Sequence, residues 1–350
     1  MSCGGWRALF WAGVAIALGA AALIASQVPG QAPHRDPVDG GGALLVTAGS
    51  VALLYGIIEG PVAGWGSWRV PGSLALAVML LAAFAWYETR REHPMLDPRL
   101  FRLGGVRAGA LGIFALFFAL FGLFYVNAQY LQDVKGYTAL LSGVAIVPLA
   151  ALMPYTSGRS TQLAERIGGR ATIVIGLLCV MVGLTLMSFA TAATPYPLYG
   201  LLLALTGGGC GLALPPLSGM IVHALPPTHA GVSSGLNSTT RELGSAVGVG
   251  VLSTILTARF ASHLPATLQD IPAATGKAVR QSITAALTYS NRASSPSIRE
   301  HLLTAARDAF TSGTSVGLRV GAALLLLDTA VVALQLPTEQ RTVGDRPDAR

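Results

Sequence analysis

Polar side chains interrupt the long apolar segments of this chain, and their spacing is the first indication of chemistry. In segment 108–132, Tyr125, Gln129 and Gln132 recur at positions i, i+4 and i+7, which places them on one face of a helix. Such a stripe either lines a polar cavity or ties neighbouring helices together through hydrogen bonds. Asn127 falls on the opposite side of the same helix. The sequence leaves both interpretations of the stripe open.

Segment 231–257 carries a second stripe, whose one basic residue is Arg241. Its neighbours on the same face, within about 100° of arc at helical spacing, are Ser234, Asn237, Ser238 and Ser245. Glu242 follows directly but points roughly 100° away around the helix. An arginine inside an apolar stretch must face a cavity, a carboxylate or backbone carbonyls. Asn237 and Arg241 therefore join the first stripe as candidates for a substrate pathway, with structural pinning as the alternative.

Two carboxylates lie deep in apolar segments and could carry a proton. Asp328 is near the middle of segment 316–336, and Glu242 lies inside segment 231–257. A charge at mid-bilayer costs roughly 2.5–3.5 kcal/mol even on insertion scales, so such residues are commonly functional. The alternative for Asp328 is a buried acid that is satisfied by its neighbours.

Patterns typical of enzymes and metal sites are missing from the sequence. It contains no Gly-x-Ser-x-Gly elbow, no phosphate-binding loop and no paired histidines at metal spacing. Of the three cysteines, Cys179 and Cys210 lie in apolar runs, which favours neither a disulfide framework nor a metal site. We expect no enzymatic activity, no cofactor and no metal.

The composition explains which elements must position these residues. The 350 residues are 52% hydrophobic and 11% charged, whereas soluble domains carry about 25% charged residues. Segments of about 20 apolar residues are long enough to cross a bilayer. The first of them, with Arg7 before it, has a signal peptide as its alternative interpretation. The sequence predicts an all-α integral membrane protein with about nine transmembrane helices at 6–26, 42–59, 71–88, 108–132, 140–157, 171–192, 196–222, 231–257 and 316–336.

The basic residues predict how these helices are oriented in a plasma membrane. If the N-terminus is outside, the short inside segments hold twelve arginines: Arg35, Arg90, Arg91, Arg99, Arg102, Arg107, Arg159, Arg166, Arg170, Arg341, Arg346 and Arg350. The short outside segments hold three basic residues, Arg7, Arg69 and Lys135. This asymmetry follows the positive-inside rule, so the net charge of +7 reflects topology, and no nucleic-acid partner is expected. Residues 297–310 read as an amphipathic helix on the outer surface.

Several motifs resemble those of one transporter family. The most specific is Ala-Gly-Val-Ser-Ser-Gly-Leu-Asn at 230–237, followed by Arg-Glu-Leu-Gly at 241–244. Glu-His-Pro-Met-Leu-Asp-Pro-Arg-Leu-Phe at 92–101 and the gating-loop-like segment 161–170 add to it. The chain resembles the C-terminal two-thirds of the fourteen-helix drug/proton antiporters of the major facilitator superfamily, from about helix six to helix fourteen. Thr161 and Glu165 depart from that family's loop motif, which has glycine and aspartate there.

The resemblance implies a domain organisation. Residues 1–27 would form the last helix of an N-terminal bundle, and residues 28–107 two linking transmembrane helices with a cytoplasmic linker. Residues 108–336 would form a C-terminal six-helix bundle with an external loop at 258–315, and 337–350 a cytoplasmic tail. The linking helices would pack outside the bundle as a hairpin. The resemblance also makes Glu165, Arg166 and Arg170 candidates for a gating loop that forms an inside latch.

The function implied is proton-coupled efflux of drugs or small organic metabolites. Its partners would be membrane lipid, a small amphipathic organic substrate and protons. Facilitator substrate sites lie between two bundles, and the family's first five helices have no counterpart here, so we expect the missing half to be supplied by another chain. We expect no proton-coupled efflux from residues 1–350 alone. The alternatives are a transport-inactive truncated membrane protein and an uptake or metabolite carrier of the same fold.

Overall fold

A computed structural model describes residues 5–27, 39–91, 98–226, 230–263, 282–290 and 296–335. All regular secondary structure in these ranges is helical. Nine helical stretches within them are long and apolar enough to cross a membrane, which confirms the predicted fold class. In chain order the helices are α1 (Gly5–Gln27), α2 (Gly40–Ala63), α3 (Arg69–Glu88), the 3₁₀-helix η1 (Pro98–Arg102), α4 (Gly104–Gln129), the π-helix η2 (Tyr130–Val134), α5 (Ala139–Ala145), α6 (Val147–Ile167), α7 (Gly169–Met187), α8 (Tyr196–His223), α9 (Ala230–His263), α11 (Ile283–Ser290) and α12 (Pro296–Gln335). The predicted tail 337–350 and the motif residues 92–97 lie outside the described ranges.

The chain divides into two units, residues 1–39 and 40–350. The first contains α1, whose side chains from Phe10 to Gln27 are all exposed. A helix that is apolar on every side needs neighbouring helices or lipid around it.

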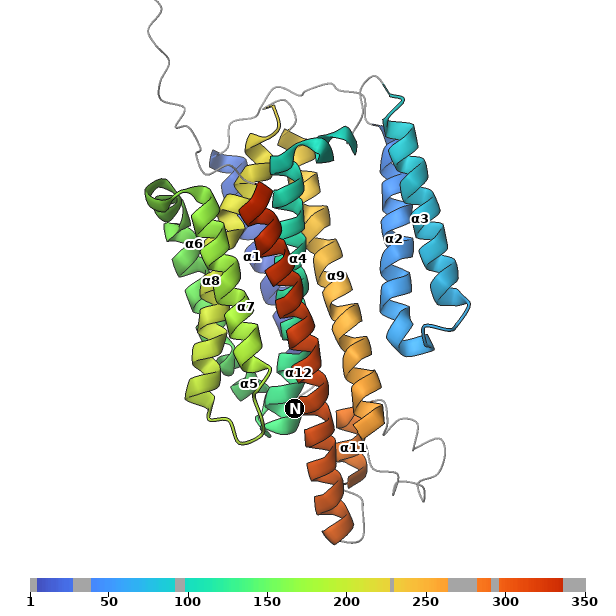
Figure 1. Cartoon of the computed structure of the whole chain (residues 1–350), viewed down its shortest axis with the longest axis vertical. Helices are drawn as coiled ribbons and strands as arrows, with labels where there is room; N and C mark the ends of the chain where they lie inside the picture. The colour runs from blue at the N-terminus through green and yellow to red at the C-terminus, as the bar shows by residue number, and fades with distance from the viewer. Residues whose placement is uncertain are drawn as a thin grey trace, which may run out of the picture. The chain divides into compact units, whose positions relative to one another are not determined.

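The second unit begins with a hairpin formed by α2 and α3 (Figure 1). The turn between them includes Gly64, whose φ of 87° lies in the region that favours glycine. The hairpin contacts the rest of the unit through α9, where a Cβ on Gly250 would lie 2.3 Å from Ile57 Cγ2. In addition, Trp65 Nε1 donates to Thr254 Oγ1 at 3.1 Å. Both contacts involve α9 alone among the bundle helices.

The six-span bundle consists of α4 with η2, α5 with α6, α7, α8, α9 and α12 (Figure 1). Within it, α4 packs on α9 as α8 packs on α6, and α4 packs on α12 as α8 packs on α7. In chain order the first three spans are α4, α5 with α6, and α7, and the last three are α8, α9 and α12. Replacing each span by its counterpart in the other set gives the same packed pairs, which is the pattern of two three-helix repeats.

Glycines bring two of these pairs into backbone contact. A Cβ on Gly211 of α8 would lie 2.1 Å from the carbonyl oxygen of Met153 on α6. A Cβ on Gly248 of α9 would lie 2.3 Å from the carbonyl oxygen of Phe118 on α4. Small residues that permit such approach drive helix association in membranes, where the hydrophobic effect between helices is absent.

Two irregularities interrupt the spans. The fifth predicted span breaks after α5, and α6 restarts with Pro148 in its first turn, because proline lacks the N–H that a continuous helix would need. By contrast, Pro154, Pro215 and Pro216 lie inside helices that continue past them. The end of α4 widens into the π-helix η2, in which hydrogen bonds run from i to i+5 and the residues are rotated relative to an α-helix.

Segment 258–315 differs from the predicted external loop. Residues 258–263 continue α9, residues 283–290 form α11, and residues 296–315 belong to α12, a helix of 40 residues. The amphipathic stretch at 297–310 is therefore continuous with the last span and does not lie flat as a separate helix. Leu302, Ala306 and Phe310 are buried, which explains the continuity, because their four-residue spacing gives α12 one packed face.

Candidate functional site

The stripe on α4 is only partly as predicted. Tyr125 and Gln129 are both half-buried, and Tyr125 packs against the core. The Gln129 side-chain amide donates to the Tyr125 carbonyl at 3.2 Å, so this bond stays within one helix. Gln132 is exposed, because it lies in the π-helical turn, where the spacing of an ideal α-helix no longer applies. The predicted stripe thus shortens to Tyr125 and Gln129.

The stripe on α9 has a charged end that contacts α4. The guanidinium carbon of Arg241 lies 5.4 Å from the centre of the Phe117 ring, within the range of a cation–π interaction. Its Nε is buried, and no described residue accepts a hydrogen bond from it. Asn237, one turn earlier, donates from Nδ2 to the Ser233 carbonyl at 3.1 Å. Its Oδ1 is buried and accepts no hydrogen bond from a described residue. Glu242, next to Arg241 in the sequence, is exposed.

An aromatic ladder on α4, which the sequence analysis missed, continues from Phe117. Its rings are spaced i, i+3, i+7 and i+10, and its members are Phe114, Phe117, Phe121 and Phe124. The ring centres of Phe117 and Phe121 are 5.9 Å apart, and those of Phe121 and Phe124 are 5.7 Å apart. All four side chains are at least partly exposed. Their helical periodicity was visible in the sequence, but in a segment rich in phenylalanine it reads as ordinary membrane-helix composition.

Hydrogen bonding distinguishes residues that tie helices together from residues that do not. Asn127 is buried, and its Oδ1 accepts a hydrogen bond from the Tyr199 hydroxyl of α8 at 2.8 Å. By contrast, the bonds recorded for Gln129 and Asn237 go to carbonyls of their own helices. The interhelical role therefore belongs to Asn127, on the side opposite the stripe. Neither Gln129 nor Asn237 makes a side-chain hydrogen bond to another helix among the described residues.

Asp328 lies where three helices meet. It is 6% exposed, and neither carboxylate oxygen has a hydrogen-bond partner among the described residues. A Cβ on Gly112 of α4 would lie 3.4 Å from Asp328 Oδ2 and 2.5 Å from Leu217 Cδ2 of α8. Arg319 does not pair with Asp328, because it donates to Ser188 Oγ at 3.2 Å. Since an unpaired charge is costly in such apolar surroundings, the protonated acid suits this position better than the carboxylate.

The gating-loop candidates separate into two groups. Arg170, at the start of α7, donates to the Ala333 carbonyl near the end of α12 and so connects two spans. Glu165 and Arg166 are exposed at the end of α6, and neither forms an ion pair with a described residue. Of the predicted latch, only Arg170 reaches another helix.

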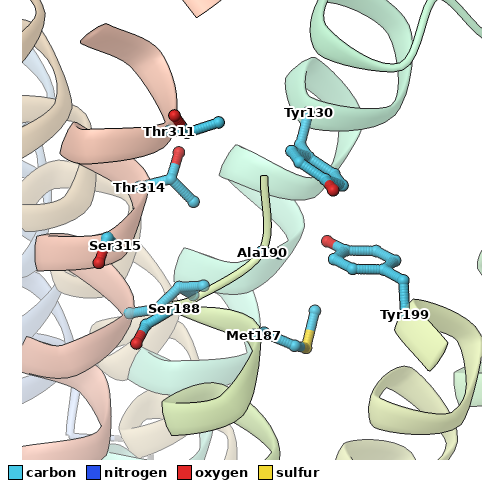
Figure 2. Close-up of a pocket in the computed structure, with 9 residues that line it drawn as sticks. Tyr130, Met187, Ser188, Ala190, Tyr199, Thr311, Thr314 and Ser315 are labelled. Carbon is cyan, nitrogen blue, oxygen red and sulfur yellow. The ribbon is translucent and has the colours of Figure 1, made fainter. Parts of the chain in front are cut away.

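A polar pocket lies apart from these candidates, between the end of α4 and helices α7, α8 and α12 (Figure 2). The rings of Tyr130 and Tyr199 stack at its edge with centres 4.8 Å apart, and the Tyr130 hydroxyl donates to the Thr191 carbonyl at 2.8 Å. Thr314 is buried, and its hydroxyl has no described partner. The lining residues are Tyr130, Met187, Ser188, Ala190, Tyr199, Thr311, Thr314, Ser315 and Leu318.

The loop between α7 and α8 is held beside this pocket by Lys135. Its ammonium group donates to the Ala192 carbonyl at 2.9 Å and to the Thr194 carbonyl. Partial burial lowers the pKa of Lys135 from its usual range, because burial disfavours the charged form. None of the residues that the sequence analysis selected lines the pocket.

These features define a multi-pass helical protein of the cell membrane, with a bundle that has a tightly packed interior and a polar, aromatic face. The sequence profile of the Major Facilitator Superfamily matches residues 1–249, and the chain belongs to that family. The resemblance seen in the motifs is thereby confirmed, and the family is one of transporters.

Three relatives illustrate the match. The chain is 34% identical over 264 residues to the multidrug resistance protein Stp of Mycobacterium tuberculosis, covering 74% of this chain and 48% of that protein. It is 30% identical over 265 residues to the tetracenomycin C resistance and export protein of Streptomyces glaucescens, covering 75% and 49%. It is 26% identical over 256 residues to a methylenomycin A resistance protein of Streptomyces coelicolor, covering 73% and 54%. The chain thus spans about half the length of these relatives.

Proposed function

We propose that this chain forms the C-terminal part, from about helix six to helix fourteen, of a transporter that exports small amphipathic organic molecules. The observation that carries the proposal is the Arg241 guanidinium lying against Phe117 on a partly exposed face, with no hydrogen bond or ion pair to a described residue. An uncompensated cation within a membrane span is costly, and such residues commonly mark a substrate pathway. The relatives named for multidrug resistance and for antibiotic export support the same class of substrate.

The face of α4 and α9 has the composition that an amphipathic ligand needs. The partly exposed rings of Phe117, Phe121 and Phe124 offer apolar stacking surface. The amide of Asn237, one turn from Arg241, offers a polar contact, because its recorded bond leaves hydrogen-bonding capacity free. Gln129 lies about 30 Å further along the helices, because Gly244 and Gly248 of α9 meet Phe114 and Phe118 of α4 in parallel register, so it belongs to the other end of this face. Binding sites of this kind are mostly apolar with a few polar groups that fix orientation. Facilitator substrate sites lie between two bundles, so this face would form one wall.

Asp328 is the proton carrier in this proposal. It is buried, unpartnered among described residues, and in contact with helices from both three-helix repeats. Loss of its proton would place a charge between α4, α8 and α12, which gives a protonation step a means of shifting how these helices pack. Glu242 is the weaker candidate, because its exposure removes the desolvation that would couple its charge to packing.

Complementation tests transport. We would co-produce this chain with an N-terminal fragment of Stp that ends after its fifth helix, in a host without its own efflux pumps, and prepare inverted membrane vesicles. Anionic fluorescein, a neutral coumarin and cationic ethidium serve as probes, with an acid-inside pH gradient. We expect gradient-driven accumulation of at least one probe, abolished by Arg241→Ala at unchanged membrane abundance. No accumulation at normal abundance of both halves would support the transport-inactive alternative.

The same vesicles separate the remaining possibilities. Accumulation that requires an alkaline-inside gradient would support an uptake carrier, because proton and substrate would then move together. Asp328→Asn should abolish the dependence on the gradient while leaving downhill flux of the probe. Gradient-driven accumulation that survives Asp328→Asn would exclude Asp328 as the carrier. Accumulation by this chain alone would contradict the expectation that a second half is needed.

A further inference from the structure

We infer that the face formed by α4 and α9 selects aromatic organic anions over organic cations of similar shape. The inference rests on the proposed function and names its substrate class. It follows from the charges of the face and from the shape of the aromatic surface beside them.

Arg241 gives the face an uncompensated positive charge. Its Nε is enclosed, and its recorded contact is the ring of Phe117, a weak partner compared with a carboxylate. Arginine remains protonated under all physiological conditions, so the charge cannot be relieved by loss of a proton. A ligand anion that meets the guanidinium would supply the missing charge, whereas a ligand cation would be repelled.

No described carboxylate already performs this role. Glu242 is exposed and lies about 100° around α9 from Arg241, about 40° beyond Ser238 at the edge of the stripe, and no ion pair joins it to Arg241. Asp328 lies on α12 beside Gly112 of α4, and a charge there has no described partner. Tyr125, Gln129 and Asn237 are uncharged at neutral pH. The charge of the face is therefore set by Arg241.

The ladder next to Arg241 favours a ring system over an aliphatic chain. Phe117 lies beneath the guanidinium, and Phe121 and Phe124 continue the surface along α4. Seven residues of helix separate Phe117 from Phe124, a rise of about 10 Å, which matches two or three fused rings. A planar aromatic acid can stack on this ladder with its carboxylate on Arg241, and aromatic stacking of this kind adds to the area it buries.

Three matched probes test charge preference by binding alone. The whole chain would be placed in phosphatidylcholine nanodiscs, and equilibrium binding of 2-naphthoate, 2-naphthylmethanol and 2-naphthylmethylammonium measured, with empty nanodiscs subtracted. We expect the anion to bind about tenfold more tightly than the cation, since one close charge pair on a partly exposed face is worth about that much. Equal or tighter binding of the cation would overturn the inference, and so would no specific binding of any probe.

Substitutions assign the preference to one residue. Arg241→Gln should bring the three affinities within about threefold of one another, and Arg241→Glu should make the cation the tightest ligand. A reversal cannot result from misfolding, which would weaken all three. Arg319→Gln is the matched control, because Arg319 also lies over a phenylalanine ring, 4.9 Å from the centre of Phe189, but on α12. Loss of the preference in Arg319→Gln, or its survival in Arg241→Gln, would contradict the assignment.

The outcomes separate the two proposals. If vesicles show no flux while nanodiscs show the anion preference, the proposed function fails and the binding inference stands. If vesicles accumulate ethidium but not fluorescein, and the nanodiscs show no anion preference, transport stands and the inference fails.

Discussion

Asn127 and Asn237 are both asparagines within membrane-spanning helices, yet they lie in different surroundings. Asn127 is 2% exposed and accepts a hydrogen bond from Tyr199, a residue of another helix. Asn237 is half-buried, and its side-chain amide donates a hydrogen bond to a carbonyl of its own helix. Its Oδ1 is buried and accepts no hydrogen bond from a described residue. The first stabilises an assembly of helices. Asn237 forms no hydrogen bond to another helix among the described residues, so its side-chain oxygen remains able to accept one from a ligand.

The same difference holds for charge. Inside the bundle, Asp328 lies among apolar neighbours, where it is best accommodated as a neutral acid. On the face of α4 and α9, the contact of the Arg241 guanidinium among the described residues is the Phe117 ring, which leaves its charge unpaired there. The interior thus holds close backbone contacts, hydrogen-bonded pairs and neutral polar groups, whereas the face keeps a charge that no described residue pairs. Substitutions in the interior should change stability, and substitutions on the face should change binding.

The largest effect is expected at the glycine contact between α6 and α8. Gly211→Ala places a methyl group 2.1 Å from the Met153 carbonyl oxygen and 2.1 Å from Thr156 Oγ1. The backbone cannot yield as a flexible side chain would, so we expect a loss of about 3 kcal/mol or more in the free energy of unfolding. Unfolding of the purified chain in mixed micelles with increasing dodecyl sulfate measures it.

Gly219→Ala is the matched control on the same helix. Its nearest neighbour would be the His223 ring at 3.7 Å, an ordinary contact, and alanine favours helix. We therefore expect a change within about 1 kcal/mol, in the stabilising direction. If both variants unfold alike, close approach of α6 and α8 does not determine the stability of the bundle.

The second-largest effect, a change of about 1 kcal/mol in the free energy of unfolding, is expected at the hydrogen-bonded pair of Asn127 and Tyr199. Tyr199→Phe keeps the ring that stacks on Tyr130 but leaves Asn127 Oδ1 without its donor. In a double-mutant cycle with Asn127→Ala, the coupling energy should be about 1 kcal/mol, since interhelical hydrogen bonds in membranes average somewhat below that value. Asn237→Ala should cost no more than about 0.5 kcal/mol. A larger cost at Asn237 than at Asn127 would reverse the comparison.

A smaller effect is expected at Asp328. Because no described group pairs with its carboxyl, Asp328→Asn replaces a neutral acid by a neutral amide of the same size, at a cost below about 1 kcal/mol. Removing one partner of a buried ion pair costs about 3–5 kcal/mol instead. Chemical denaturation at neutral pH distinguishes the two. A loss of 3 kcal/mol or more would mean that Asp328 is an ionised, paired group.

The sequence predicted the spans, because apolar length is a local property, and it predicted Asn127 on the far side of its helix from the stripe. It did not predict the π-helical turn that exposes Gln132, since this turn depends on how the end of α4 packs. It did not predict that the Glu242 side chain is exposed, because position within an apolar run does not reveal which way a residue faces. The ladder on α4 and the contact of Arg241 with Phe117 required knowledge of which helices are neighbours.

The smallest effect is expected at the pocket in Figure 2. Thr314 is buried there, and its hydroxyl forms no hydrogen bond with a described residue. Thr314→Val therefore removes a polar group without breaking a hydrogen bond between described residues. We expect a change within about 0.5 kcal/mol, in the stabilising direction. Ser160→Ala is the contrasting variant, because Ser160 is fully buried on α6 and donates to the Leu212 carbonyl of α8 at 2.7 Å. Loss of this hydrogen bond in Ser160→Ala should lower the free energy of unfolding by about 1 kcal/mol. If Thr314→Val costs as much as Ser160→Ala, the pocket holds an occupant that hydrogen-bonds to Thr314, and the interior is not limited to pairs between helices.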